Sequence, residues 1–530
     1  MPKLTIIGSG PAAAAAVLAL RRDPGHEVEI IDLGLRLEER AAAMLDGVAG
    51  APPDEWPEQA RRELSRHPVA EAGGELPLKR IFGSDFPFRD SGQLSEVTVE
   101  AGANTRAVSA AFGGFSNAWG AQVMPFSRPT LDAWPVGYEA MEPHYRAVLE
   151  QIPFAGSDDD YSEWFPPLAP IDPLPRLAPA SAAALGRYAA HRRVVRRLGV
   201  TLGAARLALR SPECVECGLC LTGCPYGLIY SSSQTLEPLI ATGEIGYRSG
   251  LLVLRVGEDD VGCWIEARDL RSGELLRLRS DRVLLACGGL GSTRIVLNSI
   301  RRDVRALTLQ ESVQLVLPFV STRPHADPRK LPSFTLNQFN MLIQYGQPGL
   351  DLAQIHLYPY NPGFDDALPR ALAASQLARS AILRRVSAGL GYLPSWSSPS
   401  IRVEVDASSP DRLPAVRLAS QPNPATRRAL GQVLARMLAV AAPLDLWPVV
   451  PALRISGAAK SYHFGGSLPH VPGPARAGAL ETDELGRPAE WRRVHLVDAS
   501  VFPSVAATTF TLTVMANAHR IAQRIRQVQP

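Results

Sequence analysis

The beginning of the chain holds the pattern that most constrains its fold. A short apolar strand is expected over residues 3–7, an alanine-rich helix over 12–21, and a second strand over 27–31. The turn Gly8-Ser9-Gly10-Pro11-Ala12-Ala13 joins the first strand to the helix, and Asp32 follows the second strand. This order of strand, glycine turn, helix, strand and acid is the fingerprint of a dinucleotide-binding unit. We therefore predict a Rossmann-type βαβ unit at the N-terminus.

Each residue of the fingerprint has a physical role. Gly8 permits the tight turn, and Gly10 lets the backbone approach a pyrophosphate. Pro11 and Ala12 open the helix, whose N-terminal amides and dipole favour phosphates. Asp32 is placed to accept hydrogen bonds from ribose hydroxyls. Glycine turns also join strands to helices for packing alone, and FAD and NAD share this turn, so the fingerprint leaves the dinucleotide open.

The length and composition of the chain bound its class. Its 530 residues exceed the size of one compact core, so two or more structural units are expected. A formal net charge of +3 is too small to predict a nucleic-acid-binding surface. No basic, cleavable leader precedes the first strand and no run of eighteen or more apolar residues occurs, so neither secretion nor a membrane span is predicted. We expect a cytoplasmic protein that binds no nucleic acid.

Further segments carry glycines or an acid next to apolar stretches. Gly113 and Gly114 allow the backbone to approach a flat ring, and Asp498 ends an apolar strand, where open α/β sheets place their ligands. The segments are Phe112–Gly120, Trp134–Tyr145, Val283–Arg294, Tyr462–Ser467, Val497–Pro503 and Thr511–Met515. In this order they resemble the glucose–methanol–choline family of FAD-dependent oxidoreductases. The resemblance covers both ends and the middle of the chain and thins between residues 305 and 450.

The resemblance implies FAD as the cofactor. It places the glycine loop beside the isoalloxazine, Asp498 at the ribityl or diphosphate portion, and the N-terminus of the last helix at the pyrimidine edge of the flavin. Some family members attach the flavin through a histidine just before the tryptophan of the glycine loop. That position is Ala118 here, so we expect non-covalent FAD. The implied cofactor residues outside the N-terminal fingerprint are Gly113, Gly114, Asn117, Ala118, Asp498, Thr511 and Leu512.

The resemblance also indicates the catalytic side chains. His463 falls where the family keeps an active-site histidine, and an imidazole there can take the hydroxyl proton while hydride leaves the carbon. The family's second catalytic residue, a histidine or an asparagine, aligns with Thr509, whose hydroxyl cannot act as a base at neutral pH. Either His463 acts alone, or a residue of the substrate domain helps, or the reaction is not plain alcohol oxidation.

Four of the six cysteines fall within eleven residues, which points to metal chemistry in a reducing compartment. They are Cys214, Cys217, Cys220 and Cys224. This spacing, with a proline after the last cysteine, is that of a bacterial ferredoxin motif and predicts a [4Fe–4S] cluster. In two-cluster ferredoxins the fourth cysteine serves the other cluster, so the fourth ligand here is Cys224 or a remote thiol, Cys263 or Cys287. A structural zinc site and an unliganded group of thiols are the alternatives.

The middle of the chain shows two patterns. Alternating apolar and polar residues over 336–344 predict strands of an antiparallel sheet above the flavin. The alternating His356, Tyr358 and Tyr360 either line a substrate pocket or pack in the core. Residues 367–396 hold arginines but no acid and predict a basic amphipathic helix. Such a helix lies on an anionic membrane at the cytoplasmic face, covers an apolar substrate channel, or is a solvated surface helix.

These predictions combine into one architecture. A discontinuous Rossmann-type α/β FAD-binding domain is built from residues 1–150, 246–304 and 456–530. Residues 151–245 connect and carry the cysteines, and 305–455 form an inserted α+β substrate domain on an antiparallel or mixed sheet. The leading function is FAD-dependent dehydrogenation of a sugar, glycoside or alcohol, with electrons leaving through the cluster to an acceptor protein or quinone. The rivals are a flavin reductase or isomerase fed by ferredoxin, and an electron-transfer subunit of a complex.

Overall fold

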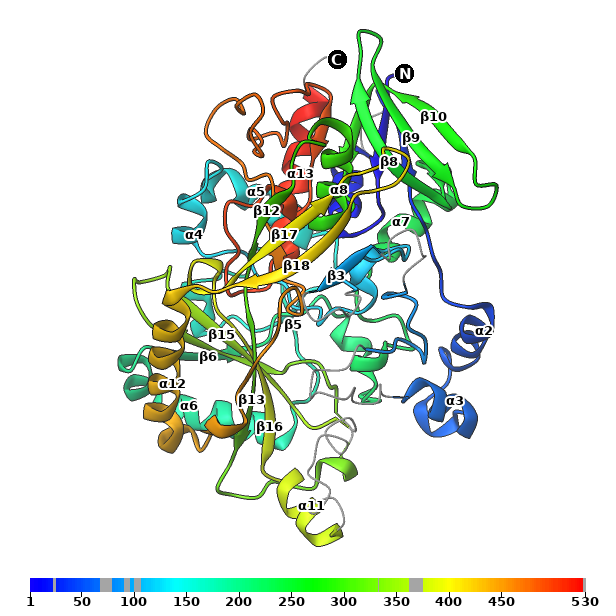
Figure 1. Ribbon diagram of the computed structural model, residues 1–530. Helices are drawn as coiled ribbons and strands as arrows, with labels where there is room; N and C mark the ends of the chain where they lie inside the picture. The colour runs from blue at the N-terminus through cyan, green and yellow to red at the C-terminus, as the bar shows by residue number, and fades with distance from the viewer. Residues whose placement is uncertain are drawn as a thin grey trace.

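The chain is described from a computed structural model, which covers residues 1–21, 25–66, 79–89, 96–99, 106–331, 333–361 and 375–527. A five-stranded parallel sheet lies at the end of the molecule where the chain begins (Figure 1). Its strands, in spatial order, are β22 (Val494–Leu496), β11 (Arg282–Leu285), β1 (Lys3–Ile7), β2 (Glu27–Ile31) and β7 (Gly246–Arg248). The sheet therefore draws on both ends and the middle of the chain, as the predicted discontinuous domain requires.

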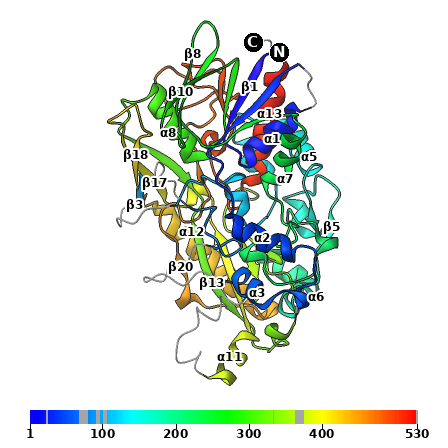
Figure 2. The same cartoon turned by 90° about the vertical axis from the view of Figure 1, so that its right-hand side faces the viewer.

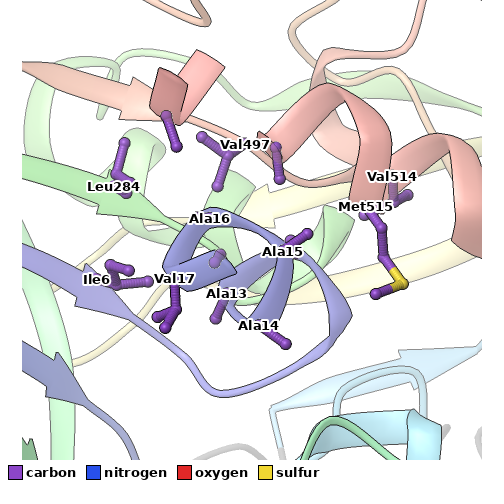
Figure 3. Packing of buried hydrophobic residues seen from close by; sticks show 14 of the residues in the cluster. Ile6, Ala13, Ala14, Ala15, Ala16, Val17, Leu284, Val497, Val514 and Met515 are labelled. Carbon is purple, nitrogen blue, oxygen red and sulfur yellow. The ribbon is translucent and has the colours of Figure 1, made fainter. Parts of the chain in front are cut away.

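The predicted N-terminal unit is confirmed almost to the residue. β1 and β2 cover the expected residues and pair in parallel, and helix α1 (Pro11–Leu20) begins one residue earlier than expected. α1 packs against α13 (Thr511–Gln527), which in turn contacts α5 (Tyr138–Leu149). Figure 3 shows the alanines of α1 between the sheet and the side chains of α13. Because alanine is small, the helix lies close to both neighbours with no void between them.

A second large sheet has seven strands and lies at the other end of the molecule (Figure 1). Its strands are β19 (Trp447–Pro448), β13 (Gln314–Val320), β16 (Val386–Tyr392), β15 (Leu352–Tyr358), β14 (Phe339–Gln344) and β6 (Val200–Ala204), with β20 (Arg454–Ile455) also pairing with β13. All of its pairings are antiparallel, as the alternation over 336–344 predicts. Helices α6 (Pro179–Arg197) and α12 (Pro424–Leu444) cover one face of this sheet.

The remaining elements connect the two sheets. A mixed sheet consists of β21 (Phe464–Gly465), β12 (Ala306–Glu311), β17 (Ser400–Asp406), β18 (Ala415–Gln421) and β3 (Val97–Val99). A meander of β8 (Leu251–Glu258), β9 (Cys263–Asp269) and β10 (Leu275–Ser280) precedes α8 (Gly289–Ile300). Helices α2 (Glu39–Val48) and α3 (Glu58–Leu64) lie below the five-stranded sheet in Figure 2. The shorter elements are α4 (Arg128–Asp132), α7 (Ser232–Ala241), α11 (Gln376–Leu383), β4 (Ala155–Gly156) and β5 (Asp172–Pro173).

The basic helix predicted over residues 367–396 is wrong for much of its length. Residues 367–374 lie outside the described residues, α11 ends at Leu383, and residues 386–392 form strand β16. β16 pairs with β13 on one side and with β15 on the other, so pairing in the centre of a sheet decides the state of these residues. In the described part of the chain, no helix is long and apolar enough to cross a bilayer.

Candidate active site

The turn after β1 has the geometry that the fingerprint predicts. Gly8 has a φ of +101°, and a Cβ there would lie 2.6 Å from the carbonyl oxygen of Ala286, so only glycine fits without strain. A Cβ on Gly10 would meet nothing within 4 Å, so the backbone is open at that residue. α1 begins with Pro11 and has no side-chain cap. The amides of Ala12 and Ala13 precede the first backbone hydrogen bond of the helix, from Ala14 to the carbonyl of Gly10, and are therefore available to phosphate oxygens.

Asp32 follows β2 and is tied to the same turn. The hydroxyl of Ser9 donates a short hydrogen bond to its carboxylate and accepts one from the amide of Gly113 at 2.9 Å. Burial raises the pKa of Asp32 to about 7. Hydroxyl donors from a ribose would stabilise the ionised form of this desolvated carboxyl. The pattern predicted Asp32 but not Ser9, which joins the two glycine segments.

The glycine loop packs directly against the N-terminal turn. Gly113 and Gly114 have φ values of +88° and +58°, and a Cβ on Gly114 would lie 3.3 Å from Cα of Gly10. Two bare stretches of backbone, 104 residues apart in the sequence at the Ser9–Gly113 hydrogen bond, thus lie side by side. Side chains at these glycines would fill the space, so this part of the chain fits a closely approaching cofactor such as FAD.

Asn117 and Ala118 end the glycine loop. The amide nitrogen of Asn117 donates to the carbonyls of Phe112 at 2.9 Å and Gly114 at 2.8 Å, so this side chain holds the shape of the loop. The ammonium of Lys79 donates to the carbonyl of Ala118 at 3.1 Å, and burial lowers the pKa of Lys79 to about 8. Lys79 belongs to no sequence motif. The structure shows that it contacts the end of the glycine loop.

The predicted cofactor residues near the C-terminus begin with Asp498, which lies at the carboxyl end of β22 in the five-stranded sheet. Asp498 follows β22, and its carboxylate accepts hydrogen bonds from the amide of Ser500 at 3.0 Å and from the hydroxyl of Ser292, in the first turn of α8. Burial raises the pKa of Asp498. At the start of α13, Leu512 is buried and Thr511 is half-buried. The predicted cofactor residues therefore gather at the carboxyl ends of β1, β2, β11 and β22, where parallel sheets bind ligands.

His463 precedes β21 and lies between two aromatic rings. Its imidazole stacks on Tyr392 with ring centroids 4.6 Å apart, and the ring of Phe510 meets it edge-on at 5.1 Å. Its main chain is fixed because its carbonyl accepts from the amide of Ser312 and its amide donates to the hydroxyl of Ser461. Desolvation by the surrounding protein lowers the pKa of His463 to about 4, so the ring is neutral at pH 7. A neutral imidazole held in this way is able to accept a proton.

Tyr462 connects this histidine to the glycine loop. Its ring meets Phe115 of the loop at a centroid distance of 5.3 Å, and both rings pack with Ala118 and Phe88 in one apolar cluster. Thr509, the other predicted catalytic residue, lies one residue before Phe510 and donates its hydroxyl proton to the carbonyl of Gln122 at 2.9 Å. Its donor is therefore already used by the main chain. This hydrogen bond anchors the segment whose next residue, Phe510, contacts His463.

Several polar side chains beside His463 were not predicted. The amide of Gln122 is hydrogen-bonded to His356 at 2.8 Å, and its oxygen accepts from Asn337 at 2.6 Å. The alternation over 336–344 marked the strand region but not its contacts, and nothing in the sequence around Gln122 signalled its role. His356 and Tyr358 lie on β15 as expected, whereas Tyr360 lies beyond the end of that strand.

The four cysteines of the ferredoxin-like motif gather between α2, α3 and the segment before β14. Burial, and then the charges of the neighbouring thiols, raise the pKa of Cys217 to about 12 and of Cys220 to about 11. Cys224 contributes to the raised pKa of both Cys214 and Cys220, so the charges of the motif thiols influence one another. The amide of Thr335 donates to Sγ of Cys220 at 3.3 Å. Amide donors of this kind stabilise thiolates that hold a metal or a cluster.

The two remaining cysteines lie elsewhere. The thiol of Cys263, in β9, donates to carbonyls of the strand edge, and that of Cys287 donates to the carbonyl of Ile7 at 3.2 Å. Neither thiol is among the charges that act on the motif cysteines. Among the described residues, no three or more histidine, cysteine, aspartate or glutamate side chains form a group arranged to hold a metal ion.

Comparisons with known proteins bear on the fold. No protein-family model and no curated protein sequence matches the chain. Among solved structures, pyridoxine 4-oxidase from Mesorbium loti superposes with a TM-score of 0.60 at 13% identity, over 100% of both chains. A new fungal aryl-alcohol oxidase superposes with a TM-score of 0.60 at 12% identity, over 99% of both chains. The predicted mixed α/β fold is confirmed: over its whole length the chain folds as these two oxidases do.

Proposed function

We propose that this chain is an FAD-dependent dehydrogenase that oxidises a CH–OH group and passes the electrons to an iron–sulfur cluster. The observation that carries the proposal is the neutral imidazole of His463, one residue from a tyrosine that packs on the glycine loop. The two similar structures are those of a pyridoxine 4-oxidase and an aryl-alcohol oxidase, which agrees with this reaction class. When bound, FAD would accept the hydride, and the cluster would accept electrons one at a time.

The protein's own residues would bind the cofactor without a covalent bond. Ser9 and Asp32 would hold the ribose, the N-terminus of α1 the pyrophosphate, and Asp498 the ribityl or diphosphate portion. Gly113 and Gly114 leave room for the flat ring. Ala118 offers no nucleophile, so we infer non-covalent FAD.

His463 would take the hydroxyl proton of the substrate. Its Nδ1 is buried and makes no hydrogen bond with the described residues, which leaves Nε2 as the nitrogen that meets the substrate. The rings of Tyr392 and Phe510 hold the imidazole plane from two sides, so it is oriented before the substrate binds. Loss of the proton to Nε2 raises the electron density on oxygen and makes hydride departure from the carbon easier.

This role of His463 predicts a pH profile. Only the neutral ring accepts a proton, and the pKa of His463 is lowered to about 4, so the rate of flavin reduction should be level from pH 8 to about pH 5. It should fall as the pH drops through about 4, where the ring becomes charged. Stopped-flow reduction of the bound flavin across this range measures the midpoint, with circular dichroism to confirm that the fold persists. A midpoint near the ordinary histidine value of about 6.5 would contradict the assigned environment.

We propose a [4Fe–4S] cluster on Cys214, Cys217, Cys220 and Cys224 as the outlet for electrons. A zinc ion binds each sulfur at about 2.3 Å and so draws four thiolates to one point. The proposal rests on the ferredoxin-like spacing of the four cysteines and on the amide of Thr335, which donates to Sγ of Cys220 at 3.3 Å. Phe82 contacts Gly223 beside the cysteines and also packs in the apolar cluster of Phe115 and Ala118. One side chain thus bridges the motif and the glycine loop, and a nearby one-electron carrier favours a dehydrogenase over an oxidase.

Anaerobic reduction of the purified protein tests this function. We expect the isolated protein to carry FAD that acid precipitation releases, and an alcohol or sugar to bleach the flavin absorbance without oxygen. The reduced enzyme should then pass its electrons to a one-electron acceptor, a protein or a quinone, faster than to oxygen. Flavin that only ferredoxin or dithionite reduces would instead favour the reductase or isomerase.

A further inference from the structure

The two faces of the seven-stranded sheet differ sharply in polarity. The face toward α6 and α12 is apolar and carries alternate residues of each strand, such as Leu315, Met341 and Ile355. The opposite face contacts the segment that follows the glycine loop, and several of its buried side chains are polar. These are Gln314, Asn340, Gln354, His356, Tyr358 and Tyr392. Burial of so many hydrogen-bonding groups is costly unless they meet partners.

A chain of hydrogen bonds crosses this polar face. The amide nitrogen of Asn337 donates to Oδ1 of Asn340 at 2.9 Å and to Oε1 of Gln122 at 2.6 Å. Since its oxygen is used in this way, Gln122 presents its nitrogen to Nε2 of His356, at 2.8 Å. His356 therefore accepts at Nε2 and carries its proton on Nδ1. Burial lowers the pKa of His356 to about 3, so this donor is neutral.

The chain of hydrogen bonds leaves polar atoms without partners. Among the described residues, Oδ1 of Asn337 and Nδ2 of Asn340 are buried and make no hydrogen bond. With Nδ1 of His356, the network offers one acceptor and two donors, all uncharged. A carboxylate would require a cationic partner and an ammonium an acidic one. A hydroxyl group is both donor and acceptor, so neutral hydroxyls match this set of atoms.

The network lies next to the reacting position. The ring of Tyr392 stacks on His463 and lies 5.1 Å from the ring of His356, so one aromatic ring separates the two imidazoles. The main-chain carbonyl of Gln122 accepts from Thr509, and Gln122 follows Ala118 by four residues. Tyr392 thus links His463 to His356, and Gln122 and Asn337 continue the connection to Asn340.

We infer that the substrate is a neutral polyol, such as a sugar, cyclitol or glycoside, whose non-reacting hydroxyls bind His356, Asn337 and Asn340. This inference rests on the proposed alcohol oxidation and narrows it. A simple aliphatic or aryl alcohol would leave the buried amides unpaired, and sites built to hydrogen-bond a hydroxyl discriminate strongly against analogues without one. The Thr509 hydroxyl is bonded to the main chain, so polar side chains of the substrate domain would assist His463 by orienting the substrate.

Flavin reduction by matched substrates tests the inference in the wild-type holoenzyme. The panel pairs myo-inositol with cyclohexanol, adds D-glucose, methyl glucoside and benzyl alcohol, and includes D-glucuronate as a charged analogue. We expect a neutral polyol to reduce the flavin most efficiently, with the mono-alcohols about 10- to 100-fold weaker in rate over half-saturating concentration for each group left unpaired. Benzyl alcohol, cyclohexanol or glucuronate as the best substrate would overturn the inference while the proposed oxidation stands. Flavin that no panel member reduces, although dithionite does, would refute the proposed oxidation and the inference with it.

Two variants of Asn340 test whether the polar face of the seven-stranded sheet binds the hydroxyls of the polyol. Asn340→Leu keeps the size of the side chain and should raise the half-saturating concentration of the polyol about tenfold, with no change for cyclohexanol. Asn340→Ala gives the same reading if the leucine variant does not fold. The control is Met341→Leu, the next residue of β14, which faces the helices and should change neither value. Equal losses for polyol and cyclohexanol in the Asn340 variants would mean that Asn340 only supports the fold, and would overturn the inference.

Discussion

His463→Ala should slow reduction of the bound flavin by about 10² to 10⁴, the range expected when a positioned general base is lost. The side chain is held by ring contacts with Tyr392 and Phe510, and its Nδ1 has no hydrogen-bond partner among the described residues. FAD content should therefore match the wild type. The measurement is single-turnover flavin reduction under anaerobic conditions, with FAD released by acid and counted per chain.

Thr509→Ala provides the comparison for this variant. Its hydroxyl donates one neutral hydrogen bond to the carbonyl of Gln122, and such a bond contributes about 0.5–1.5 kcal/mol, or roughly tenfold in rate at most. We expect a loss below tenfold. A wild-type rate in His463→Ala together with a large loss in Thr509→Ala would reverse the roles assigned to the two residues.

Cys217→Ser should remove most of the iron and acid-labile sulfide from anaerobically purified protein. A serine hydroxyl is a poor ligand for iron in place of a thiolate, and a cluster with three remaining cysteines is destabilised. The flavin should stay bound, because the hydrogen bonds described between Ser9, Asp32 and Gly113 involve no motif cysteine. The visible spectrum should then lose its broad iron–sulfur absorbance and keep the flavin bands.

The matched control is Cys263→Ser, which changes a buried thiol of β9 that donates to the carbonyls of Asp281 and Arg493. A hydroxyl can make the same bonds, so iron and sulfide should be unchanged. Stoichiometric zinc without sulfide in the wild-type protein would rule out the cluster. Loss of iron in Cys263→Ser but not in Cys224→Ser would move the fourth ligand to the remote cysteine.

Patterns that depend on neighbouring residues predicted their structures well. The turn at Gly8 and Gly10 and the strands on either side are set by a few residues in a row, and they form where they were expected. β16 was mistaken for part of a helix because it follows a stretch with arginines, no acid and regularly spaced apolar residues. Its true state is decided by β13 and β15, which are distant in sequence.

The hydrogen bonds of Gln122 with His356 and Asn337 show even more strongly that local patterns do not predict contacts between distant residues. Gln122 meets His356 across 234 positions of the chain and Asn337 across 215, so no local pattern marks it. His463 could be predicted as a catalytic residue because its motif is local and resembles a known family. The low pKa of its ring depends on Tyr392 and Phe510, and only the folded chain shows that these rings enclose it.

The contact between α1 and α13 has a consequence for how the chain is made. α1 is synthesised well before α13, the helix that covers it. Roughly 500 residues separate them, and at about 5–20 residues per second the first helix waits about 25 to 100 s for its partner. During that time β11 and β22 are also missing from the sheet beside β1. Because most side chains of α1 are alanines, the helix exposes less apolar surface than a leucine-rich helix would before α13 covers it.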